Sequence, residues 1–404
     1  MVKRRIRVVH LATSIGGGAG IAAYRLHEAL LDSGADSILI SQGESPLPGV
    51  RLITRTPQQR VAQKAVTAAN RLFSGPSSIH FTPLSRGAIS VADVVSLEPD
   101  LLHVHNWYNF FDWQLAPKLS SLGVRVVTTL HDERLLTGGC HYTLGCTGAS
   151  MDCSMCPQSR VPRLTPTRQA RYSARRAMID SGATLVAPSH WLARRAKEVS
   201  QPVSVECQVI PNTVGADLLR DAETSSTRNE HVTIGVVLGK APSLLQAILD
   251  ELARILGPTR VPGVELVAAG EGPIPTWGGR VAHSGRIDSD ASRARFWDQA
   301  DIGLFVTRSD NFPNTILEGL ARGVPQIVPD IGGAPEAVQT TGGGLVSQGD
   351  PRSMAEALDT LMQDLSLRSR ASRAALAGAR EFYAPSVIAK KYMKLYERAL
   401  ESNG

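Results

Sequence analysis

The sequence lacks any apolar run long enough to cross a membrane as a helix, which takes about 18 residues. Lys3, Arg4 and Arg5 precede an apolar stretch, but this stretch is short and is interrupted by His10 and Thr13, so we expect no signal peptide. Aromatic residues make up only 5% of the chain and no nucleic-acid-binding motif is present, which argues against a nucleic-acid partner. With 43% hydrophobic and 20% charged residues, the 404-residue chain is expected to be a globular protein of the cytoplasm.

Cysteine is also scarce. Five cysteines in a chain of this length fit a reducing compartment better than a disulfide-based scaffold. Basic residues outnumber acidic ones, since the chain has 43 Lys and Arg and 37 Asp and Glu, which gives a net charge of +6. This excess favours anionic partners, and phosphate groups and anionic membrane surfaces are the two that remain.

Apolar runs alternate with helical patterns along most of the chain, which predicts parallel α/β sheets. We expect strands at residues 7–12, 36–41, 100–105, 124–130, 184–188 and 205–210, and, after a polar linker at 222–230, at 264–269, 302–306 and 326–329. The second series begins at Val232, and helices are expected at 21–31 and 386–401. Two doubly wound, Rossmann-like domains follow from this order, with ligand sites at the carboxyl ends of the strands.

The expected boundaries give an N-terminal Rossmann-like, acceptor-binding domain at residues 1–215 and a C-terminal, donor-binding domain at 216–382. The remaining residues, 383–404, form a C-terminal helix that we expect to pack back toward the N-terminal domain.

Two acidic residues eight apart, Asp310 and Glu318, flank a polar turn between an apolar strand and an apolar helix. The backbone N–H groups of Asn314 and Thr315 at the start of this helix can face a diphosphate, and Asn311 lies in the same turn. Glu318 can then accept hydrogen bonds from ribose hydroxyls and Asp310 from sugar hydroxyls. The pattern indicates a nucleotide-sugar site. The alternative is an ordinary strand–loop–helix unit with solvated acids.

This segment, followed by Pro329-Asp330-Ile331-Gly332-Gly333-Ala334-Pro335-Glu336, resembles the donor-site signature of retaining glycosyltransferases of family four. In that family the first acid is usually a glutamate, where this chain has Asp310. The resemblance implies the GT-B fold, in which two domains face a central cleft. It further implies metal-independent, retaining transfer without a covalent intermediate. The donor would be a UDP-, GDP- or dTDP-sugar, and the acceptor a glycan or a lipid-linked glycan of bacterial polysaccharide biosynthesis.

The resemblance also assigns residues to the donor phosphates and base. Gly17 and Gly18 match the family's glycine loop, which lies across the cleft from the donor phosphates, although Gly18-Ala-Gly20-Ile-Ala-Ala23 also fits a dinucleotide fingerprint in poor context. Gly270 and Glu271 match the turn near the base. Where the family usually has a basic residue and then a Lys-Gly pair, this chain offers only Lys240. Because of this departure from the family pattern, the alternative that the chain is an inactive homologue stays open.

The resemblance places the family's active-site histidine at His131, with Asp132 beside it to orient the ring. A histidine satisfied at a strand end is the plainer reading. His105 ends the strand expected at 100–105, Asn106 and Trp107 follow it, and an imidazole and an aromatic face there suit an acceptor sugar. Core packing is the alternative for His105, and capping of the domain is the alternative for Trp107.

Four cysteines lie within 17 residues, at Cys140, Cys146, Cys153 and Cys156. With the neighbouring Gly-Gly and Cys-His-Tyr, they resemble a bacterial subgroup that includes colanic-acid-type exopolysaccharide glycosyltransferases, and this resemblance runs from Arg7 to the C-terminal helix. The four thiolates can bind a structural zinc, with His141 as a replacement for one of them. Free thiols or one disulfide are the alternatives.

Asp288-Ser289-Asp290 matches a pattern that holds a metal in another glycosyltransferase fold. Here it begins a helix, so N-capping explains it better, and we expect no catalytic metal.

A run of arginines at positions 160, 163, 168, 171, 175 and 176 is a solvated helix face or, if the acceptor is lipid-linked, a contact with the inner face of the membrane.

Two rival functions remain. A GT-B-fold sugar-nucleotide epimerase would lack the donor signature around Asp310 and Glu318. A non-catalytic, sugar-nucleotide-binding partner of a glycan assembly complex is favoured only by the weak basic site at Lys240.

Overall fold

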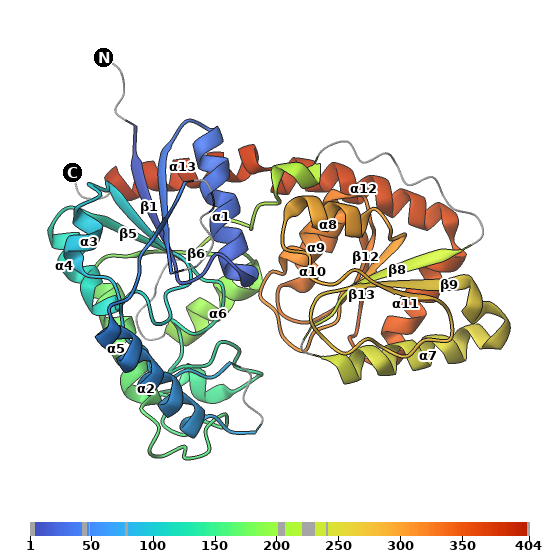
Figure 1. Ribbon diagram of the computed structural model, residues 1–404, viewed down its shortest axis with the longest axis horizontal. Coiled ribbons are helices and arrows are strands. Elements are labelled where there is room, and N and C mark those ends of the chain that lie inside the picture. The colour runs from blue at the N-terminus through green and yellow to red at the C-terminus, as the bar shows by residue number, and fades with distance from the viewer. Residues whose placement is uncertain are drawn as a thin grey trace. The chain divides into compact units, whose positions relative to one another are not determined.

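A computed structural model of the protein describes residues 5–42, 47, 49–76, 80–200, 207–219, 231–239 and 241–401. The chain divides into two units, which we describe separately (Figure 1). Unit 1 comprises Met1–Pro211 and Ala389–Gly404, and unit 2 comprises Asn212–Ile388. No helix among the described residues is long and apolar enough to cross a membrane.

Unit 1 is built on a seven-stranded parallel sheet with the order β3-β2-β1-β4-β5-β6-β7. Its strands are β1 Arg7–Ala12, β2 Asp36–Ser41, β3 Val50–Leu52, β4 Leu101–Val104, β5 Arg125–Thr129, β6 Thr184–Ala187 and β7 Cys207–Val209. Apolar side chains of the central strands point to both faces, because helices cover both faces of such a sheet.

The helices of unit 1 are α1 Gly17–Asp32, α2 Pro57–Phe73, α3 Val91–Val95, α4 Ala116–Ser121, α5 Thr167–Asp180, α6 His190–Ser200 and the part of α13 Pro385–Glu401 from Ala389 onward, with 3-10 turns η1 Trp113–Leu115 and η2 Thr147–Ser150. Helices α3 to α6 pack on one face of the sheet in the main core, and α1 packs on the other. Helix α2 contributes only Asn70 as a buried residue.

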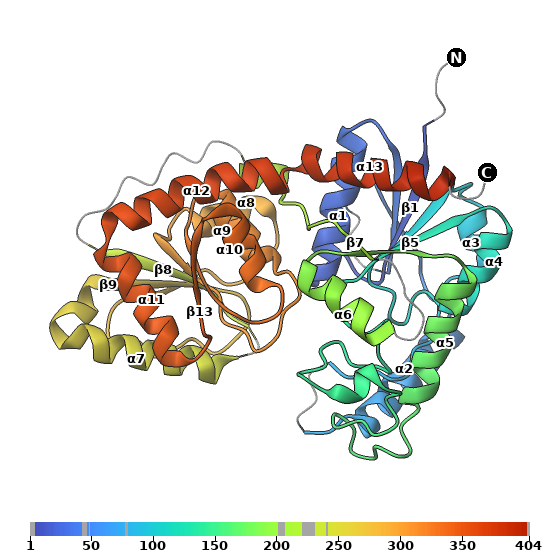
Figure 2. The same cartoon turned by 180° about the vertical axis from the view of Figure 1, so that it is seen from behind.

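Unit 2 contains a six-stranded parallel sheet with the order β10-β9-β8-β11-β12-β13. Its strands are β8 Val232–Val237, β9 Val264–Ala269, β10 Val281–His283, β11 Ile302–Leu304, β12 Gln326–Pro329 and β13 Gly344–Ser347. Helices α7 Pro242–Arg260 and α11 Pro351–Gln363 pack on one face. Helices α8 Asp290–Trp297, α9 Asn314–Ala321, α10 Ala334–Thr341 and α12 Leu365–Tyr383 pack on the other, which gives three layers (Figures 1 and 2). The 3-10 turns are η3 Ala216–Leu219 and η4 Val261–Gly263.

The strands expected from apolar runs are present, some of them shorter by one to three residues, whereas β3, β10 and β13 were not expected. These three strands have three or four residues each, lie at sheet edges, and are mostly half-buried. A short edge strand needs no continuous apolar run, so the sequence pattern gives little sign of it. The predicted linker at 222–230 lies outside the described residues.

Both sheets reverse their strand order at one point. In unit 1, β1 is followed by β2 and β3 on one side, while β4 pairs with its other side. In unit 2, β8 and β11 are neighbours in the same way. The loops that leave two such neighbours at their carboxyl ends diverge to opposite faces, so each sheet has a natural ligand-binding position there.

A chain of buried polar groups joins α13 to the sheet of unit 1. Tyr396 Oη lies 2.7 Å from His103 Nδ1, whose Nε2 lies 2.9 Å from Thr129 Oγ1. The same threonine hydroxyl lies 2.9 Å from Tyr392 Oη. Since these side chains are almost fully buried, the hydrogen bonds replace the water that the polar groups lose on folding.

We expect Tyr396→Phe to lower the free energy of unfolding of unit 1 by about 1–3 kcal/mol, because the ring volume is kept while His103 Nδ1 loses its partner. Urea denaturation measures this change. Tyr172→Phe on α5, where the ring is 65% exposed, is the matched control and should change little. Equal stability of the Tyr396→Phe variant and the wild type would contradict the role of this hydrogen bond.

Candidate active site

In unit 2, the loop after β11 and the first turn of α9 form the predicted anion site. Helix α9 begins at Asn314 after Pro313, with no side-chain cap and no acidic residue in its first turn. Asn212 fixes this turn, because its Nδ2 donates to Phe312 O at 3.2 Å and to Asn314 Oδ1 at 3.0 Å. Ile316 N–H donates to Pro313 O at 3.2 Å, so the N–H groups of Asn314 and Thr315 are the ones that can face a phosphate at this end.

The Gly-Gly pair after β12 is explained by its contact with the backbone of Asp310. Gly333 N–H donates to Asp310 O at 3.2 Å. At Gly332, where φ is +62°, an added Cβ would lie 1.9 Å from the same oxygen. Only glycine allows this approach, so the pair holds the loop that carries Asp310.

Glu318 lies within α9 and is 97% buried, beside a cation that the sequence did not indicate. Its Oε1 lies 3.4 Å from Arg293 Nε on α8, and Arg293 Nη1 lies 3.0 Å from Asp290 Oδ1. A buried carboxylate needs such a partner, because an isolated charge away from water is costly. The spacing of three residues between Asp290 and Arg293 on one helix is the only sequence signal that could have suggested this pair.

The predicted N-cap at the Asp288-Ser289-Asp290 segment is confirmed. Ser289 Oγ accepts a hydrogen bond from Ser292 N–H at 3.1 Å and caps α8, while Asp290 pairs with Arg293. The local geometry therefore uses this segment for helix capping and an ion pair.

Two other predicted donor residues in unit 2, Gly270 and Glu271, lie at the carboxyl end of β9. Gly270, with φ +100°, turns the chain after β9, and its N–H donates to Gly285 O at 2.7 Å. Glu271 is exposed and lies 3.2 Å from Arg286 Nη1. Lys240, the predicted phosphate contact after β8, lies outside the described residues.

In unit 1, the predicted glycine loop opens α1 at the carboxyl end of β1. Gly17 has φ +72° and Gly16 caps the helix without a side-chain hydrogen bond, so the first turn of α1 resembles that of α9 in its lack of a cap. Thr13 ties this loop to the loop after β4: its N–H donates to Asn106 O at 2.7 Å and its hydroxyl lies 2.8 Å from Tyr108 O. The predicted residues Gly17, Gly18 and Asn106 therefore lie at one sheet edge.

A row of buried imidazoles runs behind this edge. His131 Nε2 lies 3.1 Å from His105 Nδ1, and His105 Nε2 lies 3.0 Å from His10 Nδ1. His103 stacks beside His105, with ring centroids 4.0 Å apart. Sequence reasoning found His131 and His105 but missed His10, although a histidine inside the apolar strand β1 was the available signal. In the sheet, His10 is the direct register partner of His103.

These imidazoles are held neutral. Burial and repulsion by neighbouring histidines keep the pKa values of His10, His103 and His105 well below the usual range. Burial lowers the pKa of His131 to about 4, although the charge of Asp132 opposes it, and burial lowers the pKa of His27 to about 4. At neutral pH, His131 is therefore a hydrogen-bonding group without a charge.

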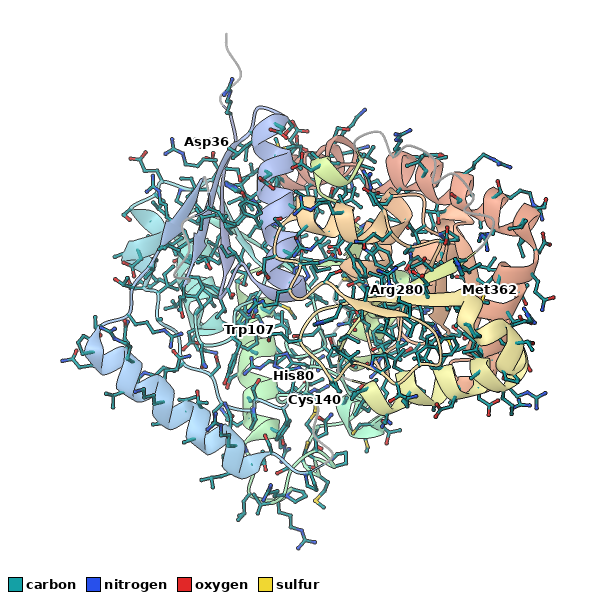
Figure 3. The ribbon with its side chains drawn as sticks, turned by 45° about the vertical axis from the view of Figure 1, so that its right-hand side comes forward. Asp36, His80, Trp107, Cys140, Arg280 and Met362 are labelled. Atoms are coloured by element: carbon teal, nitrogen blue, oxygen red, sulfur yellow. The ribbon has the colours of Figure 1, made fainter. Side chains whose placement is uncertain are left out.

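Asp132 and Trp107 take part in a second network, which Arg134 organises. Asp132 Oδ2 lies 2.6 Å from His141 Nδ1, and its Oδ1 accepts from Arg134 N–H at 2.9 Å. Burial alone would raise the pKa of Asp132, but His141 and Arg134 outweigh it and lower that pKa. The Arg134 guanidinium lies 4.1 Å from the centre of the Trp107 ring, labelled in Figure 3, so one face of this aromatic ring stacks on arginine.

The four clustered cysteines are free in the structure, and Cys140 is labelled in Figure 3. The thiol of Cys140 shares a hydrogen bond with Cys156, which raises the pKa of Cys140 and lowers that of Cys156. In the described part of the chain, only His10, His103 and His105 bring three ligand atoms within 4.8 Å of one another, so no three of the cysteine sulfurs do. A tetrahedral thiolate site needs sulfurs about 3.8 Å apart. His141 uses both ring nitrogens elsewhere. The zinc site stays a prediction.

Two parallel sheets, each with predicted site residues at its carboxyl edge, match the GT-B fold, and comparisons with known proteins give the family. The profile described as "Glycosyltransferase Family 4" matches residues 16–218, half of the chain, and that described as "Glycosyl transferases group 1" matches residues 232–364. The chain belongs to glycosyltransferase family 4, which confirms the resemblance drawn from Asp310 and Glu318.

The sequence is similar to the "Putative colanic acid biosynthesis glycosyl transferase WcaC" of Escherichia coli K12, with 26% identity over 95% of this chain and 96% of that protein. This similarity supports the predicted colanic-acid-type subgroup.

Solved structures show the same fold. A glycosyltransferase from Rickettsia africae ESF-5 matches with a TM-score of 0.64 and 14% identity, over 99% of this chain and 100% of that chain. Anabaena Alr3699/HepE, solved with UDP and glucose, matches with a TM-score of 0.62 and 16% identity, over 97% of this chain and 100% of that chain. The two-domain α/β GT-B fold is therefore confirmed.

The buried imidazoles predict that unit 1 is sensitive to acid. The unfolded histidines bind protons as the pH falls below about 6.5, while the folded ones do not until the pH reaches their lowered pKa values. Stability is therefore complete above about pH 6.5 and is lost below it, by about 1.4 kcal/mol per pH unit for each of the five histidines. Urea denaturation at several pH values, with hydrogen exchange of β1 and β4 amides, measures this slope.

The matched variant is His27→Gln, which removes one titrating group and should reduce the slope by about 1.4 kcal/mol per pH unit. Its stability at pH 8 serves as the control for packing changes. A wild-type stability that is flat between pH 7 and about 5 would contradict the neutral state of these imidazoles.

The predicted zinc site is tested by elemental analysis of protein purified without added metal or chelator. One zinc per chain, with Cys153→Ser loosening the loop around Cys140 more than unit 2, is the expected result, because thiolate ligation couples metal binding to local folding. Substoichiometric zinc, together with four freely titrating thiols in folded protein, would leave only the free-thiol alternative.

Proposed function

We propose that the protein transfers a sugar from a nucleotide-sugar donor to a glycan or lipid-linked acceptor, with retention of configuration and without a catalytic metal. The observation that carries this proposal is the buried carboxylate of Glu318 one turn inside the uncapped N-terminus of α9. A nucleotide sugar carries its diphosphate next to a ribose, so an anion site with a carboxylate one helical turn away can bind both groups.

Unit 2 would bind the donor. The diphosphate would accept hydrogen bonds from the first-turn N–H groups of α9, including Thr315, and the dipole of the helix would stabilise the charge that develops as the bond to the sugar breaks. Glu318 would accept hydrogen bonds from the ribose hydroxyls. Asp310, whose backbone is held by Gly333, would hold sugar hydroxyls.

Metal independence rests on how charge is distributed in unit 2. The Asp-Ser-Asp segment is used by the Ser289 cap and by the ion pair of Asp290 with Arg293. Backbone dipoles and basic side chains, with Lys240 as the candidate after β8, would then balance the diphosphate.

Unit 1 would bind the acceptor. The neutral imidazole of His131, held by His105, can donate or accept a hydrogen bond to the transferred sugar without competing for a proton. Catalysis would then come from positioning and from stabilisation of the departing diphosphate, with attack of the acceptor on the face from which the diphosphate leaves.

The relatives narrow the substrates. Anabaena HepE was solved with UDP and glucose and also with UDP-glucose, which supports a UDP-sugar before a GDP- or dTDP-sugar. The similarity to a protein named for colanic acid biosynthesis supports a role in bacterial exopolysaccharide biosynthesis. Hydrolysis of nucleotide sugars by the purified protein would separate an enzyme from a non-catalytic binding partner.

Glu318→Ala should reduce turnover about 10²-fold or more, because the ribose loses its partner in the reacting complex. Glu318→Gln keeps the shape and is expected to lose less. Donor hydrolysis or transfer is measured with and without EDTA, and the anomeric configuration of the product is read by proton NMR.

The thermal midpoint is the control for this variant, since Glu318 is buried and Arg293 would keep only Asp290 as its acidic partner. Activity within twofold of wild type in folded Glu318→Ala protein would refute the role of the carboxylate. An inverted product, or activity lost in EDTA and restored by magnesium, would refute retention or metal independence in turn.

A further inference from the structure

Helix α2 is exposed along a face that is partly apolar. Of its 17 residues only Asn70 is buried. Val61, Ala65, Ala68 and Leu72 are spaced by four, three and four residues, so they form one stripe on the helix, and all four are exposed. Val61 is 69% exposed and Leu72 is 75% exposed, which is unusual for large apolar side chains.

The segment just before α5 has another exposed leucine and lies next to the end of α2. Arg160 N–H donates to Phe73 O at 2.9 Å and Gly75 N–H donates to Gln158 O at 2.8 Å, so this segment lies beside the end of α2. Figures 1 and 2 both show α2 next to this part of the chain. It then turns between Val161 and Leu164, where Leu164 is 79% exposed.

The two chain segments that contain this surface are basic and lack acidic residues. Residues 45–92 include six Arg or Lys and no Asp or Glu, and residues 153–179 include six Arg and no Asp or Glu. Arg60, Lys64 and Arg71 flank the stripe on α2, and Arg160 and Arg163 flank the turn. All five are exposed. A chain with 37 acidic residues elsewhere has therefore kept them out of these two segments.

We propose that α2 and the 160–164 turn form a surface that docks on an anionic lipid bilayer. Exposed leucines among arginines match an amphipathic helix that lies in the membrane interface, where apolar side chains enter the acyl boundary and cations meet the headgroups. A nucleic acid or another polyanion would neutralise the positive charge but would not bury the apolar side chains of Val61, Leu72 and Leu164. The docking surface requires no assumption about sugar transfer.

Docking there would bring unit 1 to the lipid surface. This surface belongs to the same unit as His131 and Asn106, the predicted acceptor residues. A lipid-linked acceptor would then be met at the membrane, and the enzyme would need no spanning segment to reach it.

Co-sedimentation of the full chain with vesicles tests the proposal. Wild-type protein should bind vesicles of phosphatidylcholine mixed with phosphatidylglycerol, should bind phosphatidylcholine alone much more weakly, and should be released by salt. Arg71→Gln with Arg163→Gln should weaken binding about 25-fold, at about fivefold for each charge. Leu72→Gln with Leu164→Gln should weaken it at least about tenfold.

Matched controls lie on α12 of unit 2. Arg370→Gln with Arg373→Gln makes the same change of charge, and Leu365→Gln removes a leucine that is 50% exposed. Both should bind vesicles like wild type, and all variants should keep the thermal midpoint because the changed side chains are exposed.

Three outcomes would overturn the proposal. Wild-type protein that ignores anionic vesicles has no docking surface. Binding that the α2 and turn variants leave unchanged lies elsewhere on the molecule. If binding depends on the arginines but not on the leucines, and single-stranded DNA displaces the protein from the vesicles, the surface attracts polyanions in general and does not insert into lipid.

Discussion

The constraint on which the rest of the structure depends is that all strands of a parallel sheet end at one edge. In each unit the strand order reverses between two neighbours, β1 and β4 in one and β8 and β11 in the other. The loops that follow these two strands leave that edge in opposite directions. The crossover connections therefore leave backbone N–H groups and short polar side chains accessible between them. The glycine loop before α1 and the Asp310 loop before α9 occupy this same position in their respective sheets.

The buried polar side chains near the two strand-end sites differ in charge. In unit 2, the buried carboxylate of Glu318 is kept by a cation, Arg293, which itself pairs with Asp290. In unit 1, the row that runs from His131 through His105 to His10 consists of imidazoles, and burial keeps them neutral. This difference fits the proposed roles of the two units, in which unit 2 would bind the diphosphate of the donor and unit 1 the acceptor. A diphosphate is stabilised by dipoles and cations, whereas a sugar hydroxyl also forms hydrogen bonds with neutral partners such as an imidazole.

Unit 1 has a second, outer region with different physical properties. Its sheet core is apolar and closed, while α2 and the 160–164 turn expose leucines and arginines. The same unit thus combines a polar interior row at the strand ends with an apolar exterior stripe. Exposed leucines gain little from folding, and their exposure among arginines fits the proposed lipid surface, which is apolar beneath a charged layer.

The sequence by itself determined the fold class, the central strands and the strand–turn–helix around Asp310 and Glu318. Apolar runs mark central strands because both faces of these strands are buried, and the Asp310–Glu318 spacing depends only on the local strand–turn–helix. The N-cap at Ser289 is equally local, and so it too was predictable.

What only the tertiary structure decided are the contacts between residues distant in the chain. His10 and His105 lie within hydrogen-bonding distance although they are 95 positions apart. Arg293 on one helix forms an ion pair with Glu318 on another. Asp132 pairs with His141. The short edge strands β3, β10 and β13 also form by pairing to a neighbour already in place. The physical reason is the same in each case: the partner is supplied by sheet register and helix packing, which no local spacing of residues encodes.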